Sequence, residues 1–193
     1  MGITFSDYSS NNICEWDSFV KNHNSTWIDA TSSWITFFEK KLKYKNYSFL
    51  IYIDNKLVGV MPLFLVKSIL FGTRLISGTI LDKSGPFLNC RIEGVWPPIQ
   101  QKLDELAIKH NVNFIELRVP PDRIPGYKIR SAYVDFYIDL QDNLVEDILK
   151  GMNKKLRNGI KKAEKEVTTD ISYARNDFIK LYNLYLKTMK SLG

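Results

Sequence analysis

The chain has 193 residues, of which 45% are hydrophobic and 25% charged, a balance typical of a soluble globular protein and unlike that of a disordered one. Its longest apolar run, residues 57–66, is far shorter than the roughly 20 residues that a membrane-spanning helix needs. The net charge of +6 comes from 27 basic and 21 acidic residues, and no basic segment followed by an apolar one opens the chain, so we expect a cytoplasmic protein without a secretory signal.

Hydrophobic periodicity predicts the elements in chain order. A strand over 3–7 is followed by helices over 12–22 and 31–44 and by strands over 47–53, 57–66 and 74–77. After a loop over 78–94 come a helix from Pro97 to about 110, strands over 113–119 and 134–140, a helix over 145–163, a strand over 168–173 and a helix over 177–192. Antiparallel neighbours followed by crossover helices predict an α/β protein with a mixed, largely antiparallel sheet flanked by helices.

Three local features refine this prediction. Asp54-Asn55-Lys56 has the composition of a hairpin turn between two strands. Pro62 cannot donate a ladder hydrogen bond, so the strand over 57–66 should bulge or lie at an edge there. Residues 49–53 are apolar at every position, which indicates a strand covered on both faces.

The two cysteines and two histidines suggest no metal site. Cys14, Cys90, His23 and His110 are far apart in sequence and form no motif with metal-ligand spacing. We therefore expect no bound metal and two reduced, buried thiols.

The positive charge is concentrated in one segment. Residues 150–165 contain seven basic residues and one acid, so the rest of the chain is neutral. At helical spacing the apolar residues of this segment share one face, and a row of cations lies opposite: Lys150, Lys154, Arg157, Lys161 and Lys165. The row is either a solvated face or a surface that binds an anion such as tRNA phosphate, a nucleotide or an anionic lipid membrane.

The order of elements and several motifs resemble the GNAT acyltransferase superfamily and, within it, the FemAB-like branch. LVGVMPLFLVKS (57–68) resembles the GxxVGVxPL hairpin of that branch, and SGTILDKSGPF (77–87) resembles its GPVxDYxG loop. KKLRNGIKKAEKEV (154–167) with FIKLYNLYLKTMKSLG (178–193) resembles its RxxIRKAxKxGVxV and FYxLYxxTxxRxG segments. The resemblance implies a first GNAT-like domain over 1–142, then a connecting long basic amphipathic helix and the start of a second, truncated half over 143–193.

The resemblance also implies a function. Such proteins transfer an aminoacyl or other acyl group from an activated ester or thioester to an amine, commonly of a cell-wall (peptidoglycan) precursor. Asp82 matches the acidic residue of the family's loop and would take the amine proton, although Asp-x-x-Gly is also common turn chemistry. The substrate-binding residues implied around it are Arg74, Ser77, Gly78, Lys83 and Gly85. Thr79 and Lys83 depart from the family's usual Pro and aromatic residue.

No tightly bound cofactor is implied, and the acyl donor would be aminoacyl-tRNA in preference to acyl-CoA. The segment Arg91-Ile-Glu-Gly-Val-Trp96 stands where a GNAT acetyltransferase has its pyrophosphate-binding motif, but it ends in a bulky Trp. The amphipathic last helix needs a cover, so we expect a missing C-terminal half or a homodimer partner. The competing interpretation is a non-catalytic module whose basic helix binds nucleic acid or a membrane surface.

Overall fold

The computed structural model describes residues 2–23, 28–70, 72–78, 84–119, 124–128 and 145–193. The chain divides into two compact units, Met1–Tyr133 and Val134–Gly193, and each is considered by itself. The domain boundary predicted at 142/143 and the strand predicted over 134–140 lie outside the described residues.

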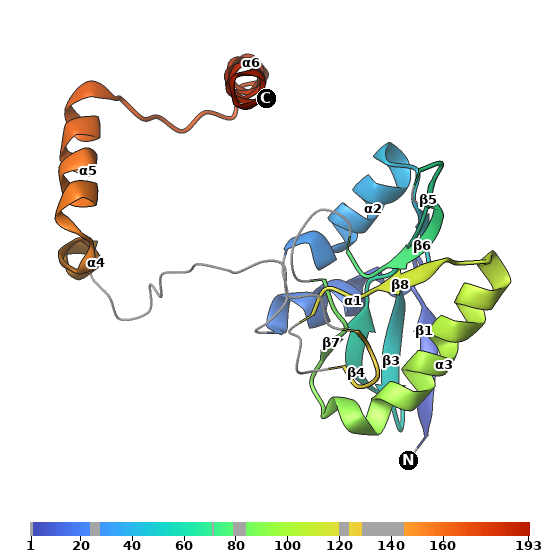
Figure 1. Ribbon diagram of the computed structural model, residues 1–193. Helices are drawn as coiled ribbons and strands as arrows, with labels where there is room; N and C mark the ends of the chain where they lie inside the picture. Colours follow the sequence, from blue (N-terminus) through green and yellow to red (C-terminus); the bar gives the residue numbers. More distant parts are fainter. Residues whose placement is uncertain (1, 24–27, 71, 79–83, 120–123, 129–144) are drawn as a thin grey trace. The chain divides into compact units, whose positions relative to one another are not determined.

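Two four-stranded sheets form the centre of the first unit (Figure 1). One has the order β1 (Ile3–Asp7), β3 (Phe49–Ile53), β4 (Lys56–Met61) and β7 (Phe87–Leu88). The other has the order β2 (Lys45–Asn46), β5 (Phe64–Ser68), β6 (Gly72–Ile76) and β8 (Phe114–Glu116). Among the described strands, every pairing is antiparallel except the parallel pair β6–β8. The predicted fold class, a mixed and largely antiparallel sheet flanked by helices, is confirmed.

The two sheets share one long, interrupted hairpin. β2 and β3 follow each other along one arm, and β4 and β5 follow each other along the other arm. The interruption falls at Pro62 and Leu63, where the sequence predicted a bulge or edge. The hairpin turns at Asp54 and Asn55, whose φ angles are 47° and 65°; Lys56, the third residue of the predicted turn, already belongs to β4.

Hydrogen bonds from outside the regular ladder hold the interruption together. The Leu63 carbonyl accepts from the Tyr47 amide at 2.8 Å. The Leu63 amide donates to Oγ of the buried Ser48 at 3.0 Å, and the Ser48 carbonyl accepts from the Tyr8 amide at 2.8 Å. Because the backbone groups at the break stay paired, the strand can bend there without leaving buried donors unsatisfied.

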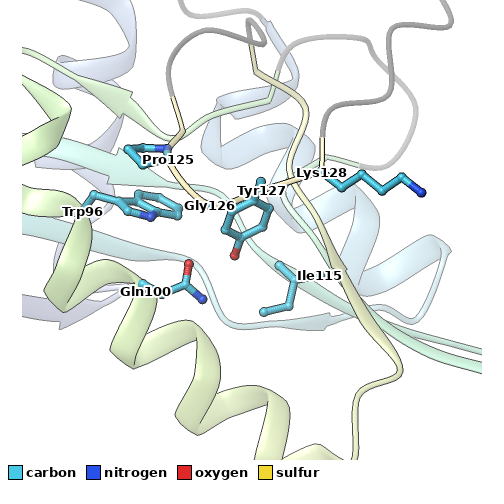
Figure 2. Close-up of a pocket in the computed structure, with 7 residues that line it drawn as sticks. All are labelled: Trp96, Gln100, Ile115, Pro125, Gly126, Tyr127 and Lys128. Atoms are coloured by element: carbon cyan, nitrogen blue, oxygen red, sulfur yellow. The ribbon is translucent and has the colours of Figure 1, made fainter.

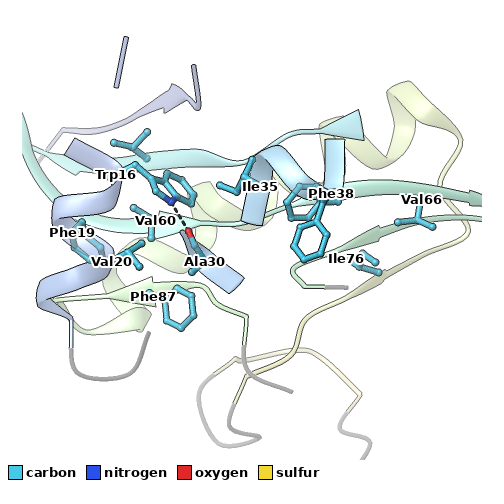
Figure 3. Close-up of a cluster of buried hydrophobic side chains, with 12 residues drawn as sticks. Trp16, Phe19, Val20, Ala30, Ile35, Phe38, Val60, Val66, Ile76 and Phe87 are labelled. Carbon is cyan, nitrogen blue, oxygen red and sulfur yellow. Dashed lines mark hydrogen bonds between the residues drawn. The ribbon is translucent and has the colours of Figure 1, made fainter. Parts of the chain in front are cut away.

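Helices cover both faces of this framework (Figure 1). The helices α1 (Ile13–Asn22), η1 (Ile28–Ala30) and α2 (Ser32–Lys41) pack on one core cluster, in which Trp16 Nε1 donates to the Ala30 carbonyl at 2.7 Å (Figure 3). The helix α3 (Ile92–His110) packs on the other cluster. Strand β3 contributes Leu50 to the first cluster and Phe49 and Ile51 to the second, as predicted for a strand covered on both faces.

Two predictions about this unit need correction. Helix α3 begins at Ile92, a full turn before Pro97, because Val95 and Trp96 are buried and anchor the additional turn against the core. The Cys14 thiol is exposed and that of Cys90 is partly buried, so the two thiols are free but not both buried.

The second unit contains α4 (Val145–Gly151), α5 (Lys154–Glu166) and α6 (Arg175–Leu192). The helix predicted over 145–163 is interrupted, because the Asn153 side chain accepts from the Leu156 amide at 2.9 Å and caps a new helix. Residues 167–174 form no strand, contrary to prediction; extended geometry alone makes no sheet without a partner strand. The predicted last helix is confirmed, and none of the described helices is long and apolar enough to cross a membrane.

The role of Ser48 can be tested by removing its hydroxyl. In Ser48→Ala the buried Leu63 amide loses its acceptor, which should lower the free energy of unfolding by about 1–3 kcal/mol. The exposed Ser33→Ala variant on α2 should stay within about 0.5 kcal/mol of the wild type. Urea denaturation measures both values, and equal stability of the two variants would contradict this account of the break.

Candidate functional site

The parallel pair β6–β8 creates the position on which the site is built. Helix α3 crosses over between the two strands, so both run in the same direction and their carboxyl ends lie side by side, with Ile76 opposite Glu116. Backbone polar groups at such ends are no longer used by a complete ladder and are available to loops and ligands. The predicted substrate loop begins at this point, directly after Ile76.

Both ends of that loop are fastened to the same residue beyond β8. The Arg118 amide donates to Ser77 Oγ at 2.9 Å, and the Arg118 carbonyl accepts from the Ser84 amide at 2.9 Å. The Ser77 amide donates to the Glu116 carbonyl at 3.0 Å. Ser77 is fully buried and Ser84 nearly so. The loop over 77–84 therefore leaves the sheet and returns to it at almost one point.

Two glycines are required for this close approach. A Cβ on Gly78 would overlap the Ser84 side chain. Gly85 has φ +95°, a left-handed conformation that side chains disfavour, and a Cβ there would lie 3.1 Å from Pro62 Cδ. The returning end of the loop consequently lies against the break of the long hairpin before it enters β7.

A charged group lies beside the loop on one face of the parallel pair. Arg118 Nε and Glu116 Oε1 are 2.9 Å apart, and Arg74 Nη1 is 4.0 Å from Glu116 Oε2. The Arg74 guanidinium lies over the Phe114 ring at 5.6 Å from its centroid. These side chains are between a quarter and a third exposed, so a ligand at the loop could reach charged groups whose positions are already fixed.

The structure brings together four of the six residues predicted here. Arg74, Ser77, Gly78 and Gly85 lie within this region, while Asp82 and Lys83 lie outside the described residues. Sequence reasoning missed Glu116 and Arg118. The available signal was the alternation of charged and apolar residues over 114–118, at the end of a strand that follows a crossover helix.

A separate pocket of about 520 Å³ lies on the α3 side of β8 (Figure 2). Its lining residues are Trp96, Gln100, Ile115, Pro125, Gly126, Tyr127 and Lys128. Trp96 and Tyr127 meet edge to face with centroids 5.7 Å apart. The pKa of Tyr127 is raised, chiefly by burial and also by the charge of Asp104, although a hydrogen bond with Gln100 opposes the shift. Of the predicted substrate-binding residues that the structure describes, Arg74, Ser77, Gly78 and Gly85, none lines this pocket.

The position of Trp96 changes one argument about the acyl donor. The sequence suggested that a Trp at this place would block the approach of CoA to the helix N-terminus. Helix α3 starts at Ile92, and the nearly buried Trp96 side chain packs against Tyr127 and the core. The Trp96 side chain thus belongs to the core cluster under α3, and the preference for aminoacyl-tRNA over acyl-CoA stays a prediction.

The row of cations in the second unit is divided between two helices. Lys150 belongs to α4, where its ammonium group lies 3.0 Å from an oxygen of Asp147. Arg157 donates from Nη1 to the Lys150 carbonyl at 2.8 Å, which satisfies a carbonyl at the end of α4. Lys154, Lys161 and Lys165 are exposed on α5. Of the five predicted cations, Lys150 and Arg157 thus have partners within the second unit, and the other three are exposed on α5.

No protein-family model and no curated protein sequence matches the chain. Among solved structures, the chain is similar to a predicted acetyltransferase with acetyl-CoA from Clostridium acetobutylicum, at 12% identity and a TM-score of 0.47 over 70% of this chain and 96% of that one. A ribosomal-protein-alanine N-acetyltransferase from Brucella melitensis is 12% identical, with a TM-score of 0.47 over 71% of this chain and 100% of that one. FemX is 18% identical, with a TM-score of 0.44 over 58% of this chain and 25% of the FemX chain. Values this low assign the chain to no family.

The closure of the loop can be tested at Gly78. Gly78→Ala should force Ser77 and Ser84 apart and lower the free energy of unfolding by about 1–3 kcal/mol, since the new methyl group overlaps a nearly buried side chain. Gly94→Ala in α3 has open space around the new methyl group and should be neutral or stabilise by up to about 1 kcal/mol. Chemical denaturation compares the two, and a Gly78→Ala protein as stable as the wild type would contradict the described contact.

Proposed function

We propose that this protein is an N-acyltransferase of GNAT-like architecture, with its reaction at the loop over 77–84. One observation carries the proposal: the loop rises from the carboxyl end of a parallel strand pair and is fastened there by Ser77 and Ser84. The element order from β1 to β8 is the order that the sequence resemblance implied. The GNAT-like resemblance and the loop position support the same assignment independently.

Acyl transfer from an activated donor requires that the protein position the reactants, and it needs no covalent intermediate on the protein. An amine nitrogen attacks the carbonyl carbon of an activated ester or thioester, and the carbonyl oxygen becomes an oxyanion that backbone N–H groups can stabilise. The nitrogen loses a proton, for which we propose the Asp82 carboxylate, and the leaving alkoxide or thiolate takes one up. The charged group of Arg74, Glu116 and Arg118 would orient a polar substrate beside the loop.

The finer assignment is FemAB-like transfer to the amine of a cell-wall or other small precursor. Its support is the likeness of residues 77–87 and 154–193 to that branch. The donor would be aminoacyl-tRNA, with acyl-CoA as the competing donor. Incubating the full chain with each labelled donor and a panel of amines, and counting label in the amine product, tests the reaction class and the donor together.

Asp82 gives the sharpest prediction for this function. Asp82→Asn should lower kcat by about 10²–10⁴-fold because the amine loses its proton acceptor, and KM should change little. The exposed Asp170→Asn variant in the second unit is the matched control and should keep wild-type turnover. Wild-type turnover in a folded Asp82→Asn protein would remove the proposed role, whereas failure of every donor with wild-type protein would remove the function itself.

The exposed cations of α5 support a second candidate function, binding of a nucleic acid. Single-stranded RNA affinity should fall steeply with salt if lysines contact phosphates. Replacing Lys154, Lys161 and Lys165 by Ala should flatten the log–log salt dependence by about 0.7 per lysine. Lys187→Ala with Lys190→Ala on α6 serves as control. Binding that is absent or indifferent to salt would leave α5 as a solvated helix.

A further inference from the structure

The hairpin β5–β6 ends in an apolar tip. The last paired residues are Ser68 and Gly72, and the sequence between them is Ile69-Leu70-Phe71, of which Phe71 is not described. Ile69 is 104% and Leu70 85% exposed. Hairpin loops usually contain Gly, Asn or Asp, because these residues readily adopt the backbone conformations of tight turns. Two large aliphatic side chains that protrude from such a tip indicate contact with something apolar.

Other exposed apolar side chains gather at the same end of the unit. Asn113 exchanges two 2.8 Å hydrogen bonds with the Thr73 backbone and so fixes the end of α3 beside the hairpin tip. Strand β2, which follows α2, pairs with β5. Figure 1 shows the C-terminal ends of α2 and α3 and the β5–β6 tip at one end of the sheets. Exposed apolar residues at this end, besides the tip, are Leu42, Ile108 and Phe114.

Lysines surround this apolar group. The segments that meet here, residues 36–46, 64–73 and 105–114, hold six lysines and two acids. The six are Lys40, Lys41, Lys43, Lys45, Lys67 and Lys109, and all are exposed. Within the described residues none of them forms an ion pair, which contrasts with the paired charges beside the loop over 77–84.

His110 provides an independent sign that several of these charges converge. Its ring packs on Tyr47 at 4.8 Å between centroids. Burial lowers the pKa of His110, and Lys109, Lys45 and Lys67 lower it further. Lysines from α3, β2 and β5 therefore act on one imidazole, so the positive potential is shared across the three segments.

We propose that this end of the first unit, defined by Ile69, Leu70 and the six lysines, docks on an anionic lipid bilayer. A protruding apolar tip surrounded by cations complements a surface whose negative headgroups lie above an apolar interior. A nucleic acid would use the lysines but leave Ile69 and Leu70 in water. The surface is distinct from the cations of α5 and from the loop at the carboxyl ends of β6 and β8.

The first test is sedimentation of the full chain with vesicles. Phosphatidylcholine vesicles containing phosphatidylglycerol should pull the protein down, and phosphatidylcholine alone should do so weakly. Replacing both Ile69 and Leu70 by Ser should weaken the partition about tenfold or more because the buried aliphatic area is lost. Ile28→Ser, a change at an exposed aliphatic residue in the segment before α2, is the matched control and should bind as the wild type does.

The charges are tested in the same assay. Lys67→Gln and Lys109→Gln should each weaken binding to the anionic vesicles roughly fivefold. Lys56→Gln, at the first residue of β4, should have no effect. A protein with Lys154, Lys161 and Lys165 replaced by Ala should keep its dependence on Ile69 and Leu70. Binding that disappears with those α5 changes alone, or that ignores the Ile69 and Leu70 replacements, overturns the proposal.

Insertion can be measured directly with a fluorescent side chain. With anionic vesicles, the fluorescence emission of a tryptophan placed at Leu70 should shift to the blue and be quenched by brominated acyl chains. The emission of a tryptophan placed at Lys56 should do neither. Wild-type protein that fails to sediment with anionic vesicles contradicts the proposal. Concentration-dependent self-association through Ile69 and Leu70, seen by analytical ultracentrifugation without vesicle binding, replaces it with a protein interface.

Discussion

The structure of the first unit depends on a break in one long hairpin. At Pro62 and Leu63 the arm formed by β4 and β5 loses regular pairing, and Ser48 and Tyr47 supply the missing hydrogen-bond partners. On one side of the break β4 pairs with β7, and on the other side β5 pairs with β6. The chain that leaves β6 must therefore cross from one sheet to the other before it reaches β7. The candidate site is the segment that makes this crossing.

The segment that crosses between the sheets is stabilised by β8, the last strand of the first unit that the structure describes. Strand β8 lies parallel to β6 because α3 carries the chain over the sheet, and its continuation at Arg118 holds both ends of the loop. Core packing under α3, through residues such as Leu103 and Ile99, consequently determines where Arg118 lies. The rigid part of the molecule and the loop that would act on a substrate are thus linked through the backbone of Glu116 and Arg118.

Most of the framework could be predicted from sequence because its signals are local. The all-apolar stretch over 49–53, the Asp54-Asn55 turn and the amphipathic helices each follow from short-range patterns, and the structure confirms them. The predicted start of α3 at Pro97 was wrong because the burial of Val95 and Trp96 outweighed the preference of proline for the first turn of a helix. The prediction of a strand over 168–173 was wrong because a strand-like sequence forms no sheet without a partner strand.

The candidate site was only partly accessible to such reasoning. Gly78 and Gly85 could be named from the loop motif, but their reason, contact with Ser84 and with Pro62, is visible only when distant segments meet. Glu116 and Arg118 depend on the parallel register of β8, which no local pattern encodes. In the second unit, the Asn153 cap competed with helix periodicity and divided a row of cations that the sequence presented as continuous.

The fastening of Ser77 and Ser84 to a single residue also bears on how such a protein can diversify. A segment whose two ends already meet has little closure entropy left to lose, and that loss grows only slowly with added length. We therefore expect that the segment over 79–83 can be exchanged, lengthened or shortened while the register of β6 and β8 stays the same, as long as Gly78 beside Ser84 is kept. The proposed substrate loop could then change in sequence without any redesign of the hydrophobic interior.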